Sequence, residues 1–375
     1  EHIDEALKMA RKSCVLLKND GVLPIDKTKV NTIGVIGPNA NSRAALIGNY
    51  HGTSSEYITV LEGIREEAGD DVRILYSQGC DLYKDKVENL AWDQDRISEA
   101  VITAENSDVV ILCVGLDETL EGEEGDTGNS DASGDKVDLH LPKVQEELIE
   151  KVTAVGKPTI VVLMAGSAID LNYAQDNCNG ILLAWYPGAR GGRAIADLLF
   201  GKESPSGKLP ITFYKDLEGM PEFTDYSMKN RTYRYMEKEA LCPFGYGLTY
   251  SDTCVTEAEV VGEVSAESDI MLKATVKNNG TVDTDEVVQV YIKDLDSPLA
   301  VRNYSLCGFK RVSLKAGEEK SVEFTISNKA MNIVDEDGNR YIAGKHFRLF
   351  AGVSQPDTRS AELTGHKPAE VEIAL

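Results

Sequence analysis

Apolar residues in the first half of the chain follow two alternating patterns, short continuous runs and stripes at helical spacing. Continuous runs such as 109–115 (VVILCVG) predict strands that are buried on both faces. Striped segments such as 141–156 start at a Pro and stop at a Gly, as amphipathic helices do. The two kinds of segment follow one another from residue 30 to about residue 201. Strands separated by helices pair in parallel, so this part predicts an α/β sandwich with a mainly parallel sheet.

Strict alternation of apolar and polar residues marks the last third of the chain. Leu272, Ala274 and Val276 fall on one face of a predicted strand, and lysines and a threonine fall on the other. Similar runs recur between turn signals, such as the Asn-Gly pair at 279–280. Short, regularly spaced strands with one apolar face are typical of an antiparallel all-β sandwich.

These patterns divide the chain into four segments. The first opens directly as a helix whose apolar stripe reaches Leu17, which suggests a piece of a longer protein. We expect a connecting helix over 1–21, the α/β sandwich over 22–215, an irregular connector rich in Pro, Gly and Tyr over 216–254, and the antiparallel sandwich over 255–375.

Charge and composition narrow the classes of partner. The chain has 375 residues and a formal net charge of −23, which argues against nucleic acid and against anionic membrane surfaces. No apolar run approaches the roughly 20 residues that span a bilayer. The seven cysteines are scattered without a CxxC pair, so we interpret them as buried thiols, which favours a reducing, cytoplasmic compartment.

An acid-rich stretch, LEGEEGDTGNSDASGDKVDLHLP, follows the predicted strand 109–115 and holds Glu121, Glu123 and Glu124 within four positions. A calcium loop is one explanation, but an EF-hand register that starts at Asp126 puts Asp131 where Gly is required. The histidines form no ligand pattern, so no metal and no cofactor is expected.

A catalytic loop is a second explanation for the same stretch. Ligands of α/β sheets bind beyond the carboxyl ends of the strands, where this stretch begins. Clustered carboxylates raise one another's pKa, and a raised pKa suits a general acid near neutral pH. From the residues alone, a solvated acidic surface loop stays open beside this interpretation and is the more frequent outcome for such a stretch.

Five long blocks of the sequence, in order, carry a resemblance to a known family. They are RKSCVLLKNDGVLPI, GLDETLEGEEGD, WYPGARGGRAIADLLFGKESPSGKLPITF, RTYRYMEKEALCPFGYGLTYS and LCGFKRVSLKAGEEKSVEFTI. Together they resemble the C-terminal part of glycoside hydrolase family 3, the family of β-glucosidases and β-xylosidases. The resemblance implies an α/β sandwich domain followed by a fibronectin type III-like domain, without the catalytic (β/α)8 barrel of the family.

The resemblance also implies a reaction. Family members retain configuration while hydrolysing β-linked sugars from the non-reducing end, with an aspartate of the barrel as nucleophile. In many of them the acid/base glutamate lies on the loop that matches this acid-rich stretch. Glu123 is the first candidate for that role, Glu121 the second and Glu124 the third, and Glu124 stands where the family commonly has Gly.

The implied partners are a β-linked oligosaccharide or glycoside and the barrel domain of the same protein. On this reading the parent protein is an enzyme, whereas this chain alone holds half of a site and is expected to be inactive. The alternative is a non-catalytic scaffold or carbohydrate-binding protein built from the same domains, with Trp92 and Trp185 stacking on sugars.

Overall fold

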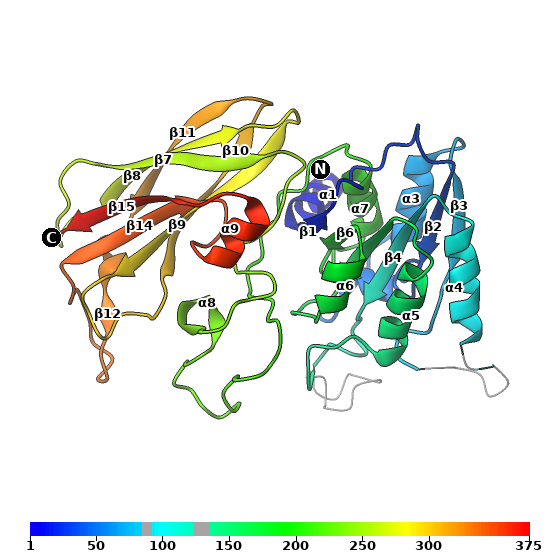
Figure 1. Ribbon diagram of the computed structural model, residues 1–375, viewed down its shortest axis with the longest axis horizontal. Helices are drawn as coiled ribbons and strands as arrows, with labels where there is room; N and C mark the ends of the chain where they lie inside the picture. The colour runs from blue at the N-terminus through cyan, green and yellow to red at the C-terminus, as the bar shows by residue number, and fades with distance from the viewer. Residues whose placement is uncertain (85–91, 93, 124–135) are drawn as a thin grey trace. The chain divides into compact units, whose positions relative to one another are not determined.

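The computed structural model describes residues 1–84, 92, 94–123 and 136–375. It divides into two compact units, Glu1–Gly207 and Lys208–Leu375 (Figure 1). This division is coarser than the four segments predicted from the sequence, whose boundaries stay predictions. Glu124, the third candidate for the acid/base, lies outside the described residues.

The first unit is built on a six-stranded sheet with the order β1-β6-β5-β4-β2-β3. Every neighbouring pair runs parallel except β1 and β6. The predicted α/β class with a mainly parallel sheet is therefore confirmed. The strands are β1 (Val15–Asn19), β2 (Thr32–Ile36), β3 (Arg73–Ser77), β4 (Val109–Gly115), β5 (Thr159–Met164) and β6 (Gly180–Leu183).

Helices cover both faces of this sheet (Figure 1). One group packs around α7 and consists of α1 (His2–Ser13), α3 (Val60–Ala68) and α7 (Gly191–Leu199). A second pair is α4 (Asp95–Glu105) and α5 (Lys143–Thr153), while α2 (Ala44–Ile47) and α6 (Asn172–Asn177) are short. The start of α3 is fixed by a capping box, because Thr59 and Glu62 each bond the other's backbone amide.

The helix expected to reach Leu17 ends earlier, and this part of the prediction is wrong. Helix α1 stops at Ser13, and Val15–Asn19 form β1, which pairs antiparallel with β6. Val15, Leu16 and Leu17 are all buried. Three consecutive apolar side chains cannot all face one stripe of a helix, whereas a strand covered on both faces buries every one of them.

Two glycines set the distance between α3 and α7. A Cβ atom on Gly63 would lie 2.1 Å from the carbonyl oxygen of Gly192, and one on Gly192 would lie 1.9 Å from the carbonyl oxygen of Thr59. Real side chains do not fit these distances, so the helix backbones touch only because both positions are glycine. This contact brings the charged residues of both helices within reach of each other.

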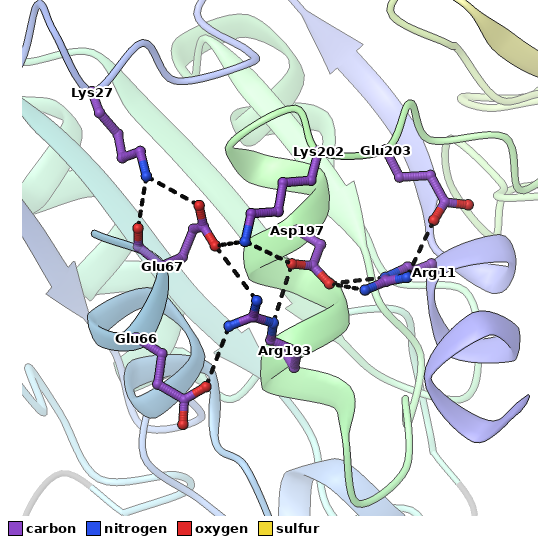
Figure 2. A network of polar contacts seen from close by, with 8 residues as sticks. All are labelled: Arg11, Lys27, Glu66, Glu67, Arg193, Asp197, Lys202 and Glu203. Atoms are coloured by element: carbon purple, nitrogen blue, oxygen red, sulfur yellow. Dashed lines mark hydrogen bonds and ion pairs between the residues drawn. The ribbon is translucent and has the colours of Figure 1, made fainter. Parts of the chain in front are cut away.

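A network of ion pairs joins the three helices on this face (Figure 2). Its centre is Asp197 of α7, which is fully buried. The Nε atom of Arg11, from α1, donates to Asp197 Oδ2 at 2.8 Å, and Arg193 Nε lies 3.2 Å from Asp197 Oδ1. Glu67 of α3 is linked to Arg193 and Lys202, and to Lys27 at 3.1 Å. Most of these charges have partners of opposite sign, as burial requires.

The Glu67 carboxylate makes part of this network pH-dependent. Burial opposes its ionisation, but the hydrogen bonds from Lys202 and Lys27 outweigh burial and lower its pKa below the ordinary 4.5. A lowered pKa in the folded state adds stability above the unfolded pKa that is lost on acidification. We expect Glu67→Gln to lower the free energy of unfolding by a constant amount above about pH 5 and by less at more acidic pH.

Urea denaturation of the wild type and of Glu67→Gln at several pH values measures this difference. Convergence of the two proteins as the pH falls below 4.5 is the expected result. A difference that stays constant down to about pH 3 would show that Glu67 contributes no charge-dependent stability.

The second unit contains a four-stranded sheet, β10-β9-β14-β15, a three-stranded sheet, β11-β8-β7, and a small β12-β13 pair. All pairings are antiparallel, and the faces predicted from alternation are buried, as at Leu272, Ala274 and Val276. The all-β class is confirmed. The strands are β7 (Thr253–Val261), β8 (Ile270–Asn278), β9 (Thr284–Asp294), β10 (Ser305–Leu314), β11 (Glu319–Ile326), β12 (Ile333–Val334), β13 (Arg340–Tyr341), β14 (His346–Gly352) and β15 (Ala369–Ala374), with the helices α8 (Thr232–Tyr235) and α9 (Thr358–Thr364) and a 3-10 turn at Asn328–Met331.

The segment before β7 is irregular apart from α8 and packs on this second sandwich. The ring of Tyr233 stacks on Phe244 with 4.3 Å between the ring centroids and meets the edge of Tyr291 on β9. The side-chain amide of Gln289 donates to the carbonyl oxygen of Gly245 at 2.9 Å. The Pro-, Gly- and Tyr-rich composition of this segment thus supplies packing and not periodic structure.

The structure also gives the burial of the cysteines and the length and polarity of the helices. No disulfide joins the seven cysteines, six of which are buried and one partly buried. Across the described ranges, every helix is too short or too polar to cross a bilayer.

Candidate active site

Four segments of the first unit meet at one edge of its sheet. Strands β2, β4, β5 and β6 run parallel, so the residues that follow each of them emerge at the same carboxyl edge. The segments are 48–52, which lies beyond β2 and α2, 117–123 after β4, 165–168 after β5, and 185–187 after β6. Hydrogen bonds between them bring three of the loop glutamates into this region.

Glu121 is the glutamate that is held most closely. Its Oε2 atom accepts hydrogen bonds from the Gly166 amide and from the Tyr186 hydroxyl, both at 2.7 Å. Its own amide donates to the carbonyl oxygen of Asp117 at 2.9 Å, which closes a turn after β4. The side chain is partly buried. Glu121 therefore ties the start of the acid-rich loop to the ends of β5 and β6.

The Tyr186 hydroxyl remains a donor at neutral pH. Burial raises its pKa far above the ordinary value of 10, and the neighbouring Glu121 carboxylate raises it further. A protonated phenol beside a carboxylate donates to it. The direction of this hydrogen bond is thus fixed by the surroundings of both groups.

Glu123 lies two residues further on and is exposed. The hydroxyl of Tyr50 donates to its Oε2 atom. Tyr50 has a left-handed backbone with a φ of 56°, which is uncommon outside glycine and costs free energy. Residues with strained backbones cluster at functional sites.

The same segment contacts a third glutamate. His51 Nε2 lies 3.1 Å from Glu118 Oε2, and His51 Nδ1 lies 3.1 Å from the carbonyl oxygen of Gly52. Consecutive residues, Tyr50 and His51, thus contact Glu123 and Glu118. The sequence analysis did not single out this segment, and its only signal is the flanking pair of glycines in GNYHG.

Lys136, near the other end of the acid-rich stretch, places a positive charge near Glu121. Its Nζ donates to the carbonyl oxygen of Ala168 at 2.6 Å. Burial lowers the pKa of the ammonium group, while the Glu121 and Asp138 carboxylates act in the opposite direction. The positive charge of Lys136 thus partly balances the negative charge of Glu121.

Glu121 and Glu123 have different surroundings in the structure, although the local sequence pattern alone does not distinguish them. Glu121 is anchored through one carboxylate oxygen by two donors, whereas Glu123 is exposed and accepts from the Tyr50 hydroxyl. Within the described residues, no cluster of three His, Cys, Asp or Glu side chains is arranged to hold a metal ion.

The tryptophans proposed for sugar stacking lie in different settings. Trp92 is 80% exposed. Trp185 is partly buried at the carboxyl edge, donates its indole N–H to the carbonyl oxygen of Ser13 at 3.1 Å, and has a φ of 55°. Trp185 thus lies in the segment after β6, with its indole N–H bonded to the end of α1.

The fold and this edge define a class of protein: an α/β sandwich with a carboxylate-bearing loop, joined in sequence to a fibronectin type III-like sandwich. Residues 14–250 match the family model of the glycosyl hydrolase family 3 C-terminal domain, and residues 286–355 match that of the fibronectin type III-like domain. The chain belongs to glycosyl hydrolase family 3.

Relatives and solved structures agree with this assignment. A β-xylosidase from Formosa agariphila is 35% identical, over 97% of this chain and 50% of its own length, and a periplasmic β-glucosidase from Salmonella typhimurium is 32% identical, over 94% and 48%. The structure of a β-glucosidase from Erythrobacter marinus superposes with a TM-score of 0.83 at 31% identity, over 100% of this chain and 50% of that one. The chain spans about half the length of the curated relatives it matches.

Proposed function

We propose that this chain is the C-terminal portion of a retaining β-glycosidase and that Glu123 is its acid/base residue. The observation that carries the proposal is the contrast at the carboxyl edge, where Glu121 is anchored and Glu123 is exposed beside a hydroxyl. The substrates named for the relatives, β-xylosides and β-glucosides, indicate the class of glycoside that this site would take.

The proposed chemistry needs two carboxyl groups on opposite sides of the glycosidic bond. Retaining enzymes hold them about 5–5.5 Å apart, one as nucleophile and one as acid and then base. Glu123 would protonate the leaving oxygen in the first step and remove a proton from water in the second. The nucleophile would come from an N-terminal barrel domain of the same protein.

Tyr50 suits both steps of that cycle. A phenolic hydroxyl can donate to one oxygen of a carboxylate and equally to the carbonyl oxygen of a carboxylic acid, whose proton then stays on the other oxygen. Tyr50 can therefore remain hydrogen-bonded to Glu123 in either protonation state, which would keep the group in one place while it gives and takes a proton.

Activity assays on the isolated chain test whether the nucleophile and the acid/base residue lie on different domains. The chain alone is expected to leave aryl β-xylosides and aryl β-glucosides intact, whereas the protein made from the full reading frame is expected to hydrolyse one of them. Release of the aryl alcohol, followed by absorbance, measures both. Hydrolysis by the chain alone would show that it holds its own nucleophile. An inactive full-length protein, or a reading frame without an upstream domain, would favour the scaffold or carbohydrate-binding alternative.

A further inference from the structure

We infer that Tyr186 is a positioning residue for catalysis, because it holds Glu121 and thereby sets where Glu123 stands. This inference rests on the proposed role of Glu123. Tyr186 donates to Glu121, and Glu123 lies two residues further on, so an effect on Glu123 would pass through the loop backbone.

The ring of Tyr186 is seated between two glycines. A Cβ atom on Gly48 would lie 2.6 Å from Tyr186 Cδ2, and one on Gly166 would lie 3.0 Å from Tyr186 Cε2. Gly48 also has a φ of 59°, which side chains seldom adopt. The glycines thus leave the space that lets the phenol ring reach the loop, and the Gly166 amide adds the second hydrogen bond to Glu121.

The two hydrogen bonds that Glu121 accepts, from Tyr186 and from Gly166, form what we call the anchor, and it lies close to Glu123 in the chain. Only Gly122 separates Glu121 from Glu123, and two residues span at most about 7 Å of extended chain. A fixed Glu121 therefore confines the backbone of Glu123 to a small volume. Gly122 has no side chain to restrict its own backbone, so the confinement depends on the contacts of its neighbours.

Segment 48–51 couples the two contacts. Gly48 lies against the Tyr186 ring, and Tyr50, two residues later, contacts Glu123. The same short segment thus touches the anchor of the loop and the proposed acid. A movement of the Tyr186 ring would therefore change both its hydrogen bond with Glu121 and the contact between Tyr50 and Glu123.

Hydrogen exchange of the chain tests the anchor without any catalysis. The amides of Leu120 and Glu121 are bonded to the carbonyl oxygen of Asp117. Loss of a hydrogen bond to a charged group should speed their exchange about tenfold in Tyr186→Phe. Tyr173→Phe is the matched control, because it removes a hydroxyl that bonds Thr153 on a helix surface instead. Equal exchange in both variants would overturn the inference.

Kinetics of the full-length protein test the positioning role. Tyr186→Phe and Gly48→Ala are expected to lower kcat about tenfold for poor leaving groups with little change in KM, and added azide should give no rescue because Glu123 is intact. Tyr186→Phe in a Glu121→Ala background should add almost nothing, since either change removes the same hydrogen bond. Full additivity, or equal losses for all leaving groups, would overturn the inference.

The proposed function and this inference can fail separately. If Glu123→Gln lacks the acid/base profile, the proposed function fails whatever Tyr186→Phe does. If Glu123→Gln shows that profile while Tyr186→Phe matches Tyr173→Phe in kcat, the function stands and the positioning role is wrong.

Discussion

Glu123→Gln in the full-length protein is expected to lower kcat about 10²- to 10⁴-fold for substrates with poor leaving groups. The amide cannot donate a proton to the departing oxygen, so the loss grows with the basicity of that oxygen. Activated aryl glycosides leave without protonation and should lose less in the first step. Their slow step becomes hydrolysis of the glycosyl-enzyme, for which the base is missing. Added azide should then restore the rate, because an anionic nucleophile needs no base.

Neighbouring glutamates supply the controls for this experiment. Glu121→Gln should weaken the hydrogen bond with Tyr186 and cause a smaller loss without azide rescue, and Glu118→Ala removes the contact with His51. An azide-rescued profile for Glu121→Gln would move the acid/base role two positions along the loop. If Glu121, Glu123 and Glu124 all lack that profile on substitution, the acid-rich stretch is a solvated surface. Rates with a series of aryl leaving groups, with and without azide, decide among these outcomes.

Asp197→Ala is expected to lower the free energy of unfolding of the first unit by about 3 kcal/mol. Asp197 is fully buried and accepts from Arg11 while also facing Arg193. Its removal leaves two partly buried guanidinium groups, with side chains 26% and 29% exposed, without their central anion. Partial exposure lets water compensate some of that charge, which keeps the effect near the lower end of the range for broken buried pairs.

Denaturation by urea, followed by tryptophan fluorescence, measures this effect selectively. Both tryptophans, Trp92 and Trp185, lie in the first unit, so their emission reports on that unit. Glu203→Gln is the matched control, because its 3.6 Å contact with Arg11 lies at the more exposed end of the network. It should change stability by less than about 1 kcal/mol. Equal losses of unfolding free energy in the two variants would show that the burial of Asp197 does not increase its contribution to stability.

The sequence predicted the regular elements well where burial leaves a periodic signal. Strand β4 is a continuous apolar run and is buried throughout, and the alternation at Leu272, Ala274 and Val276 matches the buried face of β8. Strand β1 was missed because its apolar residues extend the stripe of the preceding helix. The three consecutive apolar residues 15–17 are the local sign of a strand, and their pairing partner β6 lies more than 160 residues away in the chain.

The candidate site was predictable in location and not in detail. The rule that ligands bind beyond the carboxyl ends of strands placed the acid-rich loop correctly after β4. The partner of Glu121 lies 65 residues away in the chain, and the partner of Glu123 lies 73 residues away. Such contacts depend on how loops from different strands meet, which no local pattern records. The two glutamates therefore differ in the structure although their sequence settings are nearly alike.

Strand β1 has a practical consequence for anyone who shortens this protein. It covers β6 along one side of the sheet, from Val15 paired with Leu183 to Asn19 paired with Gly180. Truncation at residue 22, where the sequence pattern places the start of the α/β domain, would strip away this strand. The amides and carbonyls of β6 would then be unpaired at the edge of the sheet, where strands of other molecules can hydrogen-bond to them and cause aggregation. A shortened fragment should accordingly retain both α1 and β1, because Arg11 of α1 also pairs with the buried Asp197.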